Sequence, residues 1–212
     1  MTSAIGLFVN LALPTPLLPA TEPRPLLIYG AASAVGAYAI KFAKLANIHP
    51  IIGVAGSGGE FAKSIGCDVI VDYRNGNVVE DIKKALKEHA NGQKLLHVYD
   101  AISEHGSGDH INAVTDQGAI VTHVLQNEGD YDSSKFKIIR TMVGDSHGQE
   151  AYRRDFAYTY FRLFSKWLKE GRMQAHPHEV VPGGLEGVAD GLLQLKNGEV
   201  SAKKLLFKIS DA

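Results

Sequence analysis

The chain has 212 residues, of which 45% are hydrophobic and 21% charged, and its formal net charge is -1. This composition is ordinary for a soluble globular protein, and the balanced charge argues against binding to nucleic acid or to an anionic membrane surface. No apolar run approaches the length of a membrane-spanning helix. The only cysteine, Cys67, excludes an internal disulfide and suits a reducing compartment, so we expect a cytoplasmic protein.

The N-terminal stretch is apolar, which raises the question of a signal peptide. It lacks the basic residues with which a signal peptide begins, and Pro14, Pro16 and Pro19 interrupt it early. These features favour a helix over Thr2–Leu11 followed by a Pro-rich connection, and residues 1–24 are interpreted as a linking segment. An apolar helix with so few residues before it suggests a chain cut from a longer one.

The most informative stretch starts with an apolar, β-type run, Leu26–Tyr29, which ends at Gly30. Small or β-branched residues lead from there to Gly36, and a helical pattern with one apolar face continues to Ala46. A second apolar run, Ile51–Val54, comes one helix later. This order of strand, tight turn, helix and strand predicts the opening of a dinucleotide-binding βαβ unit, in which a glycine at position 36 lets helix and strand pack closely.

The turn of this unit is a candidate phosphate site. Backbone N–H groups at a helix N-terminus favour a pyrophosphate, and small side chains let it approach. The full glycine motif is absent, because Ala31 and Ser33 stand where its first two glycines would fall. The turn by itself therefore leaves two interpretations open, a merely compact turn and a nucleotide site in which Ala32, Ser33, Ala34 and Val35 contact the pyrophosphate.

Strands and helices alternate along the rest of the chain. Helices are expected at Phe61–Ile65, at Val79–Glu88, around Ile111–Val114, at Glu150–Lys169 and at Leu185–Leu195. Strands are expected at Val69–Val71, Leu95–Tyr99, Gly118–Leu125, Ile138–Val143, Glu179–Val181 and Leu205–Ile209. The alternation predicts an α/β fold with a doubly wound, Rossmann-type, mostly parallel sheet. We assign residues 25–175 to this domain and residues 176–212 to a C-terminal strand–helix–strand extension.

Several blocks, in this order, resemble the medium-chain dehydrogenase/reductase superfamily. They are IYGAASAVGAYAIKFAKL, VDYR, VYDAIS, GAIVTHVL and the ending VVPGGLEGVADGLLQLKNGEVSAKKLLFKI. The chain is similar to the zinc-independent quinone oxidoreductase and enoyl reductase branch, especially its fungal members, over nearly its whole length.

The resemblance implies NADPH as cofactor and hydride transfer to an activated double bond or a quinone, with a small-molecule substrate. It also implies a catalytic domain before this part, toward which the C-terminal segment packs, and it is compatible with a homodimer.

The choice of NADPH over NADH depends on the end of the second strand. Val54–Gly59 carries no acid, so the carboxylate that binds the ribose 2′-hydroxyl of NAD is missing and a 2′-phosphate is not repelled. The resemblance implies that Tyr73 contacts this phosphate, and we expect Ser57 to contribute to the adenosine side. The basic residue of NADP-dependent relatives is absent after the strand, where Lys63 is interpreted as a solvated helix lysine or as a replacement.

The resemblance also places Ala101, Ile102, His123 and Val124 beside the nicotinamide and its ribose. These residues follow the fourth and fifth expected strands, and such folds bind ligands at the carboxyl ends of their strands. His123 is a candidate proton donor, although a structural histidine is the favoured interpretation. No catalytic residue is identified from the sequence.

A metal site is not predicted. The histidine pairs His105/His110 and His176/His178 have no cysteine or carboxylate at the spacing of zinc ligands, and no H-E-x-x-H string occurs. Surface or loop histidines are the favoured interpretation.

Two other enzyme classes fit less well. Tyr131 and Lys135 form the Y-x-x-x-K string of short-chain dehydrogenases, but the polar stretch around them has no helical periodicity. A methyltransferase would need an acid near the end of the first strand, where this chain has Tyr29 and Gly30. The alternative of another class is a non-catalytic NADP(H)-binding module, acting as a sensor or a structural protein.

Overall fold

The computed structural model describes residues 1–126 and 131–210, and its body is a six-stranded parallel sheet. The strand order β3-β2-β1-β4-β5-β6 reverses direction at β1, as in the predicted doubly wound fold. The strands are β1 (Leu26–Tyr29), β2 (Ile51–Ala55), β3 (Val69–Asp72), β4 (His97–Asp100), β5 (Ile120–His123) and β6 (Lys137–Arg140). The Rossmann-type α/β fold is therefore confirmed.

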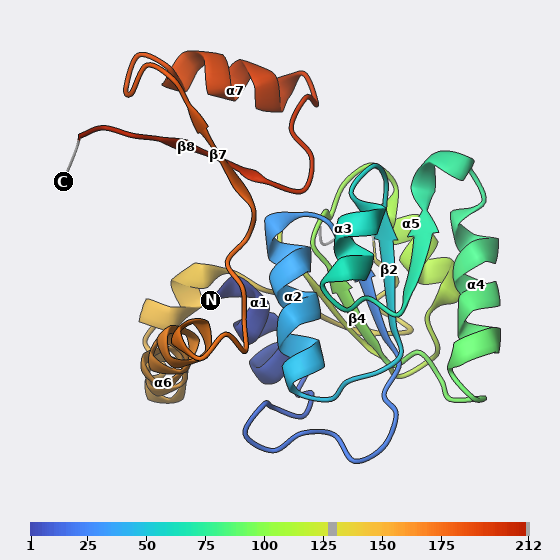
Figure 1. Cartoon of the computed structure of the whole chain (residues 1–212). Helices are drawn as coiled ribbons and strands as arrows, with labels where there is room; N and C mark the ends of the chain where they lie inside the picture. The colour runs from blue at the N-terminus through green and yellow to red at the C-terminus, as the bar shows by residue number, and fades with distance from the viewer. Residues whose placement is uncertain (127–130, 211–212) are drawn as a thin grey trace.

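Helices cover both faces of this sheet (Figure 1). The N-terminal helix α1 with its π-helical continuation η1, and the helices α2 and α6, lie on one side, and α4 and α5 lie on the other. Their bounds are α1 (Thr2–Ala4), η1 (Ile5–Asn10), α2 (Ala34–Leu45), α3 (Gly59–Ser64), α4 (Val78–His89), α5 (Ser107–Val114) and α6 (Ala151–Lys169), with short 3-10 turns η2 (Tyr73–Asn75) and η4 (Val143–His147).

Each expected element occurs, with shifted boundaries. Leu95 and Leu96 precede β4, and Val143 belongs to a 3-10 turn, so β6 ends earlier than the strand expected from the sequence.

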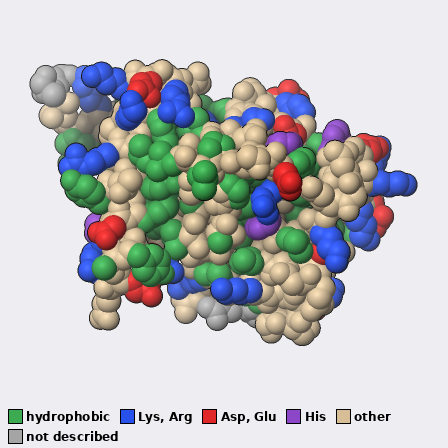
Figure 2. Space-filling view, turned by 90° about the horizontal axis from the view of Figure 1, so that it is seen from below, with side chains coloured by type: hydrophobic (Ala, Val, Ile, Leu, Met, Phe, Trp, Pro, Cys, Tyr) green, Lys and Arg blue, Asp and Glu red, His purple; other side chains and the backbone are tan. Residues whose placement is uncertain are grey.

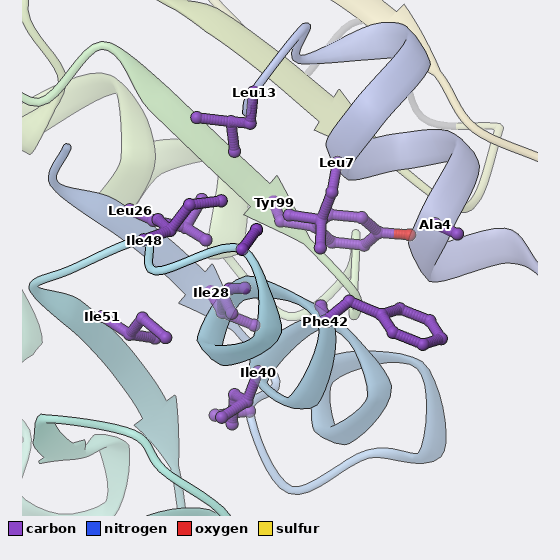
Figure 3. Packing of buried hydrophobic residues seen from close by; sticks show 14 of the residues in the cluster. Ala4, Leu7, Leu13, Leu26, Ile28, Ile40, Phe42, Ile48, Ile51 and Tyr99 are labelled. Atoms are coloured by element: carbon purple, nitrogen blue, oxygen red, sulfur yellow. The ribbon is translucent and has the colours of Figure 1, made fainter. Parts of the chain in front are cut away.

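Strand β1 shows why this sheet is buried on both faces. Leu26 and Ile28 join the cluster that includes Phe42 of α2, whereas Leu27 joins the cluster that includes Ile82 of α4. Successive side chains of a strand point to opposite faces, so a strand covered on both sides reads as a continuous apolar run. Figure 3 shows Leu26, Ile28 and Phe42 within the first of these clusters.

The N-terminal helix is part of this core. Ala4, Leu7 and Leu11 are buried in the same cluster, and Figure 3 shows Leu7 close to Tyr99 of β4. The Tyr99 hydroxyl donates a hydrogen bond to the carbonyl of Thr2 at 3.3 Å. The helix predicted as a linking element therefore packs firmly on the nucleotide-binding body.

The C-terminal segment forms a separate small sheet. Strands β7 (His178–Val181) and β8 (Lys204–Phe207) pair in parallel, and α7 (Val188–Lys196) connects them. Figure 1 shows this C-terminal unit outside the layers of the body, joined to α6 by a connector, residues 170–177. The alternating sequence pattern predicted these elements, and they lie within residues 176–212, the range assigned to a C-terminal extension.

Large hydrophobic side chains remain exposed on α6 and on the C-terminal unit. Figure 2 views the molecule from below and shows hydrophobic side chains gathered in the left half of that face. The exposed residues of the two regions include Tyr152, Tyr158, Phe161 and Leu168 on α6, and Val180, Leu185, Leu192, Leu193, Leu195, Leu206 and Ile209 in the C-terminal unit. None of the helices in the described part of the chain is long and apolar enough to cross a membrane.

Candidate cofactor-binding cleft

The turn between β1 and α2 has the geometry that a phosphate site requires. Gly30 starts the turn in a left-handed conformation, with φ at +78°. Ser33 is the N-cap of α2, because its Oγ accepts a hydrogen bond from the Gly36 N–H at 3.0 Å. A Cβ atom on Gly36 would lie 2.2 Å from the Gly30 carbonyl oxygen, so the predicted close packing of helix and strand depends on glycine at this position.

The backbone N–H groups of Ala34 and Val35 belong to the first turn of α2. N–H groups in the first turn of a helix have no acceptor within that helix, and the dipole there favours an anion. The Ser33 N–H differs from this pair, because it donates to the Gly30 carbonyl at 3.0 Å inside the turn. Ser33 therefore shapes the start of the helix, and the N–H groups suited to a pyrophosphate are those of the two following residues.

A cavity of about 260 Å³ opens at the carboxyl ends of β1 and β2, where the strand order reverses. Ligands in open α/β sheets bind at such a reversal. The predicted residues Ala32, Ser33, Ser57, Tyr73 and Ile102 all line it. The other lining residues are Gly30, Ala55, Gly56, Gly58, Val200, Ser201 and Ala202, so the lining carries no charged side chain in the described part of the chain.

A second cavity, of about 220 Å³, shares Gly30, Tyr73 and Ile102 with the first. Its remaining lining residues are Tyr29, Val54, Glu104 and His105. The Tyr73 side chain is half exposed, and a Cβ on Gly56 would lie 2.7 Å from its ring. The two cavities together form a cleft with a helix N-terminus in one part and mostly apolar walls in the other.

Tyr29 is a neutral hydrogen-bonding group at the wall of this cleft. Burial raises the pKa of Tyr29 to about 12, with smaller contributions from Asp100 and Tyr73. The phenol therefore keeps its proton, and its oxygen is hydrogen-bonded to Nδ1 of His110 at 2.9 Å. His110, for which the sequence favoured a surface or loop position, is thus engaged in the packing of α5 against β1.

The C-terminal unit contributes Val200, Ser201 and Ala202 to the first cavity, and the sequence patterns predicted none of these three residues as part of a site. The Oγ atoms of Ser57 and Ser201 are 3.0 Å apart, and Ala202 has a left-handed φ of +56°. These residues are far from Ser57 in the chain, and no local pattern marks them as part of a site. Only the folding back of the segment between α7 and β8 brings them to the cleft.

The cations nearest in sequence to the predicted 2′-phosphate position have other partners. The amino group of Lys63 donates to the Asp68 carbonyl, which fits the interpretation of a helix lysine. Arg74 binds both carboxylate oxygens of Asp72, and its hydrogen bonds lower the Asp72 pKa to about 2. Neither Lys63 nor Arg74 therefore replaces the basic residue that NADP-dependent relatives have after this strand.

The residues after β4 and β5 lie close together at the same edge of the sheet. The Ala101 N–H donates to the Tyr29 carbonyl at 2.9 Å, and the Val124 N–H donates to Ser103 Oγ at 3.0 Å. His123 is fully buried, and its Nδ1 donates to the Leu125 carbonyl at 2.8 Å. The His123 side chain thus shapes the loop after β5, which supports the structural interpretation over that of a proton donor.

The remaining motifs do not form the sites that their sequence patterns would allow. No three His, Cys, Asp or Glu side chains gather as metal ligands among the residues that the structure describes. Tyr131 donates to Asp100, whereas Lys135 donates to the Asn112 carbonyl, and the segment between them forms turns and not a helix. The short-chain dehydrogenase interpretation is therefore unsupported. Residues 127–130 of that polar stretch lie outside the described residues.

The family model described as "Zinc-binding dehydrogenase" matches residues 34–156, which is more than half of the chain. The chain belongs to this family and hence to the medium-chain dehydrogenase/reductase superfamily, which confirms the resemblance. It is similar to the trans-enoyl reductase fsr4 of Gibberella fujikuroi, with 37% identity, and the alignment covers 88% of this chain and 56% of that protein. It is also similar to the trans-enoyl reductase eqxC of Fusarium heterosporum, with 30% identity over 99% of this chain and 62% of the relative.

Two solved structures share the fold. CurA of Vibrio vulnificus in complex with NADPH matches with a TM-score of 0.72 and 20% identity, covering 100% of this chain and 62% of that one. The quinone oxidoreductase of Pseudomonas syringae matches with a TM-score of 0.69 and 18% identity, covering 90% and 58% of the two chains. The chain thus spans somewhat more than half the length of these two relatives and these two solved structures.

Proposed function

We propose that this chain is the NADPH-binding part of a cytoplasmic oxidoreductase that reduces an activated C=C bond or a quinone by hydride transfer. The observation that carries the proposal is the first cavity of the cleft, which has no charged side chain in its lining and lies between the N-terminus of α2 and the end of β2. A pyrophosphate would accept hydrogen bonds from the N–H groups of Ala34 and Val35, close to Ala32 and Ser33. The similarity to trans-enoyl reductases favours this enzyme function over a non-catalytic module.

The proposed preference for NADPH over NADH follows from the absence of a carboxylate beside Ser57 and Tyr73. Both residues line the cavity, and no carboxylate there would repel a 2′-phosphate. The proposed contacts of the other half of the cofactor come from Ala101, Ile102, His123 and Val124, with His123 contributing through its backbone because its side chain is buried. NADPH would supply the hydride, while the chain holds and orients the cofactor.

We also propose that this chain holds no functional zinc, despite the family's description. The described residues contain no cluster of three candidate ligands, and zinc sites in proteins need three or four. Metal analysis after dialysis should find far less than one zinc per chain, and a stoichiometric amount would contradict the proposal.

Residues 176–212 are proposed to pack toward a further domain that holds the substrate. The exposed hydrophobic side chains of the C-terminal unit support this proposal, as does the greater length of the relatives. Hydride transfer requires the acceptor at about 3–3.5 Å from the nicotinamide and shielded from water. We therefore expect the 212-residue chain to bind NADPH but to reduce enones and quinones poorly.

Calorimetric titration with NADPH and with NADH tests the proposed cofactor. We expect tighter binding of NADPH, and the substitution Ser57→Asp should remove that preference, because a carboxylate repels the 2′-phosphate. The matched variant Ser57→Ala introduces no charge and should keep the preference. Equal affinities of the unmodified chain for both cofactors would contradict the proposal.

A further inference from the structure

Asp100 is a fully buried carboxylate at the carboxyl end of β4. Its Oδ1 accepts hydrogen bonds from the N–H groups of Ile102 at 2.9 Å and Ser103 at 2.8 Å. Its Oδ2 accepts one from the Tyr131 hydroxyl at 2.9 Å. A buried carboxylate is costly unless such donors satisfy it, so its three partners are held in defined positions around it.

One of these partners connects the loop after β4 with the loop after β5. Ser103 has a left-handed φ of +59°, which a residue with a side chain rarely adopts without support. Its Oγ accepts hydrogen bonds from the N–H groups of Val124 at 3.0 Å and Leu125 at 3.3 Å. The hydrogen bond from the Ser103 N–H to Asp100 therefore fixes Ser103, and the loop after β5 depends on Ser103 for its own hydrogen bonds.

A further partner of Asp100, Tyr131, acts on the same second loop. Tyr131 is buried, and its ring centroid lies 5.0 Å from that of His123, whose Nδ1 in turn donates to the Leu125 carbonyl. Tyr131 belongs to the Y-x-x-x-K string, which the proposed function leaves unexplained. Its hydroxyl is directed to Asp100 and is thus tied to the end of β4.

We propose that Asp100 and Tyr131 are positioning residues that hold the loops after β4 and β5 in the shape that receives the nicotinamide half of the cofactor. Asp100 acts through Ser103, and Tyr131 acts through His123. Neither Asp100 nor Tyr131 lines the cavities of the cleft. This inference rests on the proposed NADPH site. It assigns a function to a carboxylate–tyrosine pair that belongs neither to the phosphate turn nor to the adenosine side.

The test compares two ligands that share the adenosine half. Tyr131→Phe removes only the hydroxyl that Asp100 accepts, and it should weaken NADPH binding about tenfold, equivalent to about 1.4 kcal/mol. The same variant should bind 2′,5′-ADP, which has no nicotinamide, within about twofold of the unmodified chain. Ser103→Ala should reproduce this selective loss by a different route. Tyr158→Phe is the matched control, because that tyrosine is exposed on α6 and should change neither affinity.

Hydrogen exchange without ligand supplies an independent readout. Tyr131→Phe should speed amide exchange in the loops after β4 and β5 and leave the turn before α2 unchanged. An equal loss of affinity for both ligands would mean a general structural role, and unchanged NADPH affinity in both variants would overturn the proposal. If the unmodified chain binds no NADPH, the proposed function itself fails. Titration of the unmodified chain separates this outcome from the two outcomes that concern the variants.

Discussion

Strands β1 and β8 have the same length and both pair in parallel, but their surroundings differ. All residues of β1 are buried, whereas the residues of β8 alternate between exposed and half-buried. In β1 both faces are covered by helices, while the C-terminal unit has two strands and a single helix. A two-stranded sheet is at best marginally stable by itself. Because β1 and β8 both pair in parallel, the greater stability expected for the body comes from the helices that cover its sheet and not from strand pairing alone.

The C-terminal unit depends on its attachments to the body. The amino group of Lys41, on α2, donates to two carbonyls of the connector, those of Gln174 and Ala175, at 3.0 and 3.2 Å. The His176 N–H donates to the Tyr38 hydroxyl at 3.2 Å, and Ser57 meets Ser201 at the cleft. The body is thus a stable platform, and the unit contributes to the cleft only while these contacts hold.

The largest expected difference between the regions comes from removing one large side chain in each. Phe42 is 2% exposed and its ring centroid lies 4.8 Å from that of Phe164, so Phe42→Ala should lower the free energy of unfolding by about 3–5 kcal/mol. Leu192 is 60% exposed, and Leu192→Ala should change the free energy of unfolding by no more than about 0.5 kcal/mol. Urea denaturation measures both values. Comparable losses would show that the C-terminal unit shares the core in solution.

A matched pair of glycine substitutions tests the same difference at the backbone. A Cβ at Gly36 or at Gly187 would lie 2.2 Å from a carbonyl oxygen, that of Gly30 or of Pro182 respectively. Gly36→Ala should cost about 1–3 kcal/mol, because the surrounding core resists a shift. It should also weaken NADPH binding at least tenfold by displacing the phosphate turn. Gly187→Ala should leave the urea midpoint almost unchanged, and a clear fall in that midpoint would contradict the comparison.

The smallest expected effect concerns the pH dependence of the connector. Burial lowers the pKa of His176 below its usual value, and the charges of Lys41 and Lys204 lower it further. The folded state therefore favours the neutral ring, so its contribution to stability is full above the ordinary histidine pKa of about 6.5 and declines as the pH falls below it. The protection of amides in β7 and β8 against exchange, taken relative to the intrinsic exchange rate at each pH, should fall between pH 7 and pH 5, more than in β1.

The variant His176→Gln should reduce this acid sensitivity of the connector. His89→Gln is the control, because His89 is exposed on α4 and lies away from the connector. The prediction is wrong if exchange in β7 and β8 has the same pH dependence with and without His176.

The order of the elements and the position of the cleft could be predicted from local patterns. Leu26–Tyr29 is a continuous apolar run because both faces of β1 are buried, and Gly36 is required because the helix backbone approaches Gly30. Small residues in the turn and the absence of acids after β2 carry the prediction of a phosphate site and of NADPH. Such features depend on residues close together in the chain, so the sequence contains them directly.

The tertiary structure alone decided which distant residues complete the cleft and what supports it. Ser201 reaches Ser57 only because the segment between α7 and β8 folds back, and the strand pattern does not distinguish a separate small sheet from an extension of the large one. Likewise, Tyr131 lies in a polar stretch with no periodicity, yet its hydroxyl reaches the buried Asp100. Local sequence determines backbone preference and apolar faces, whereas contacts between distant segments depend on how whole elements pack, which no short pattern encodes.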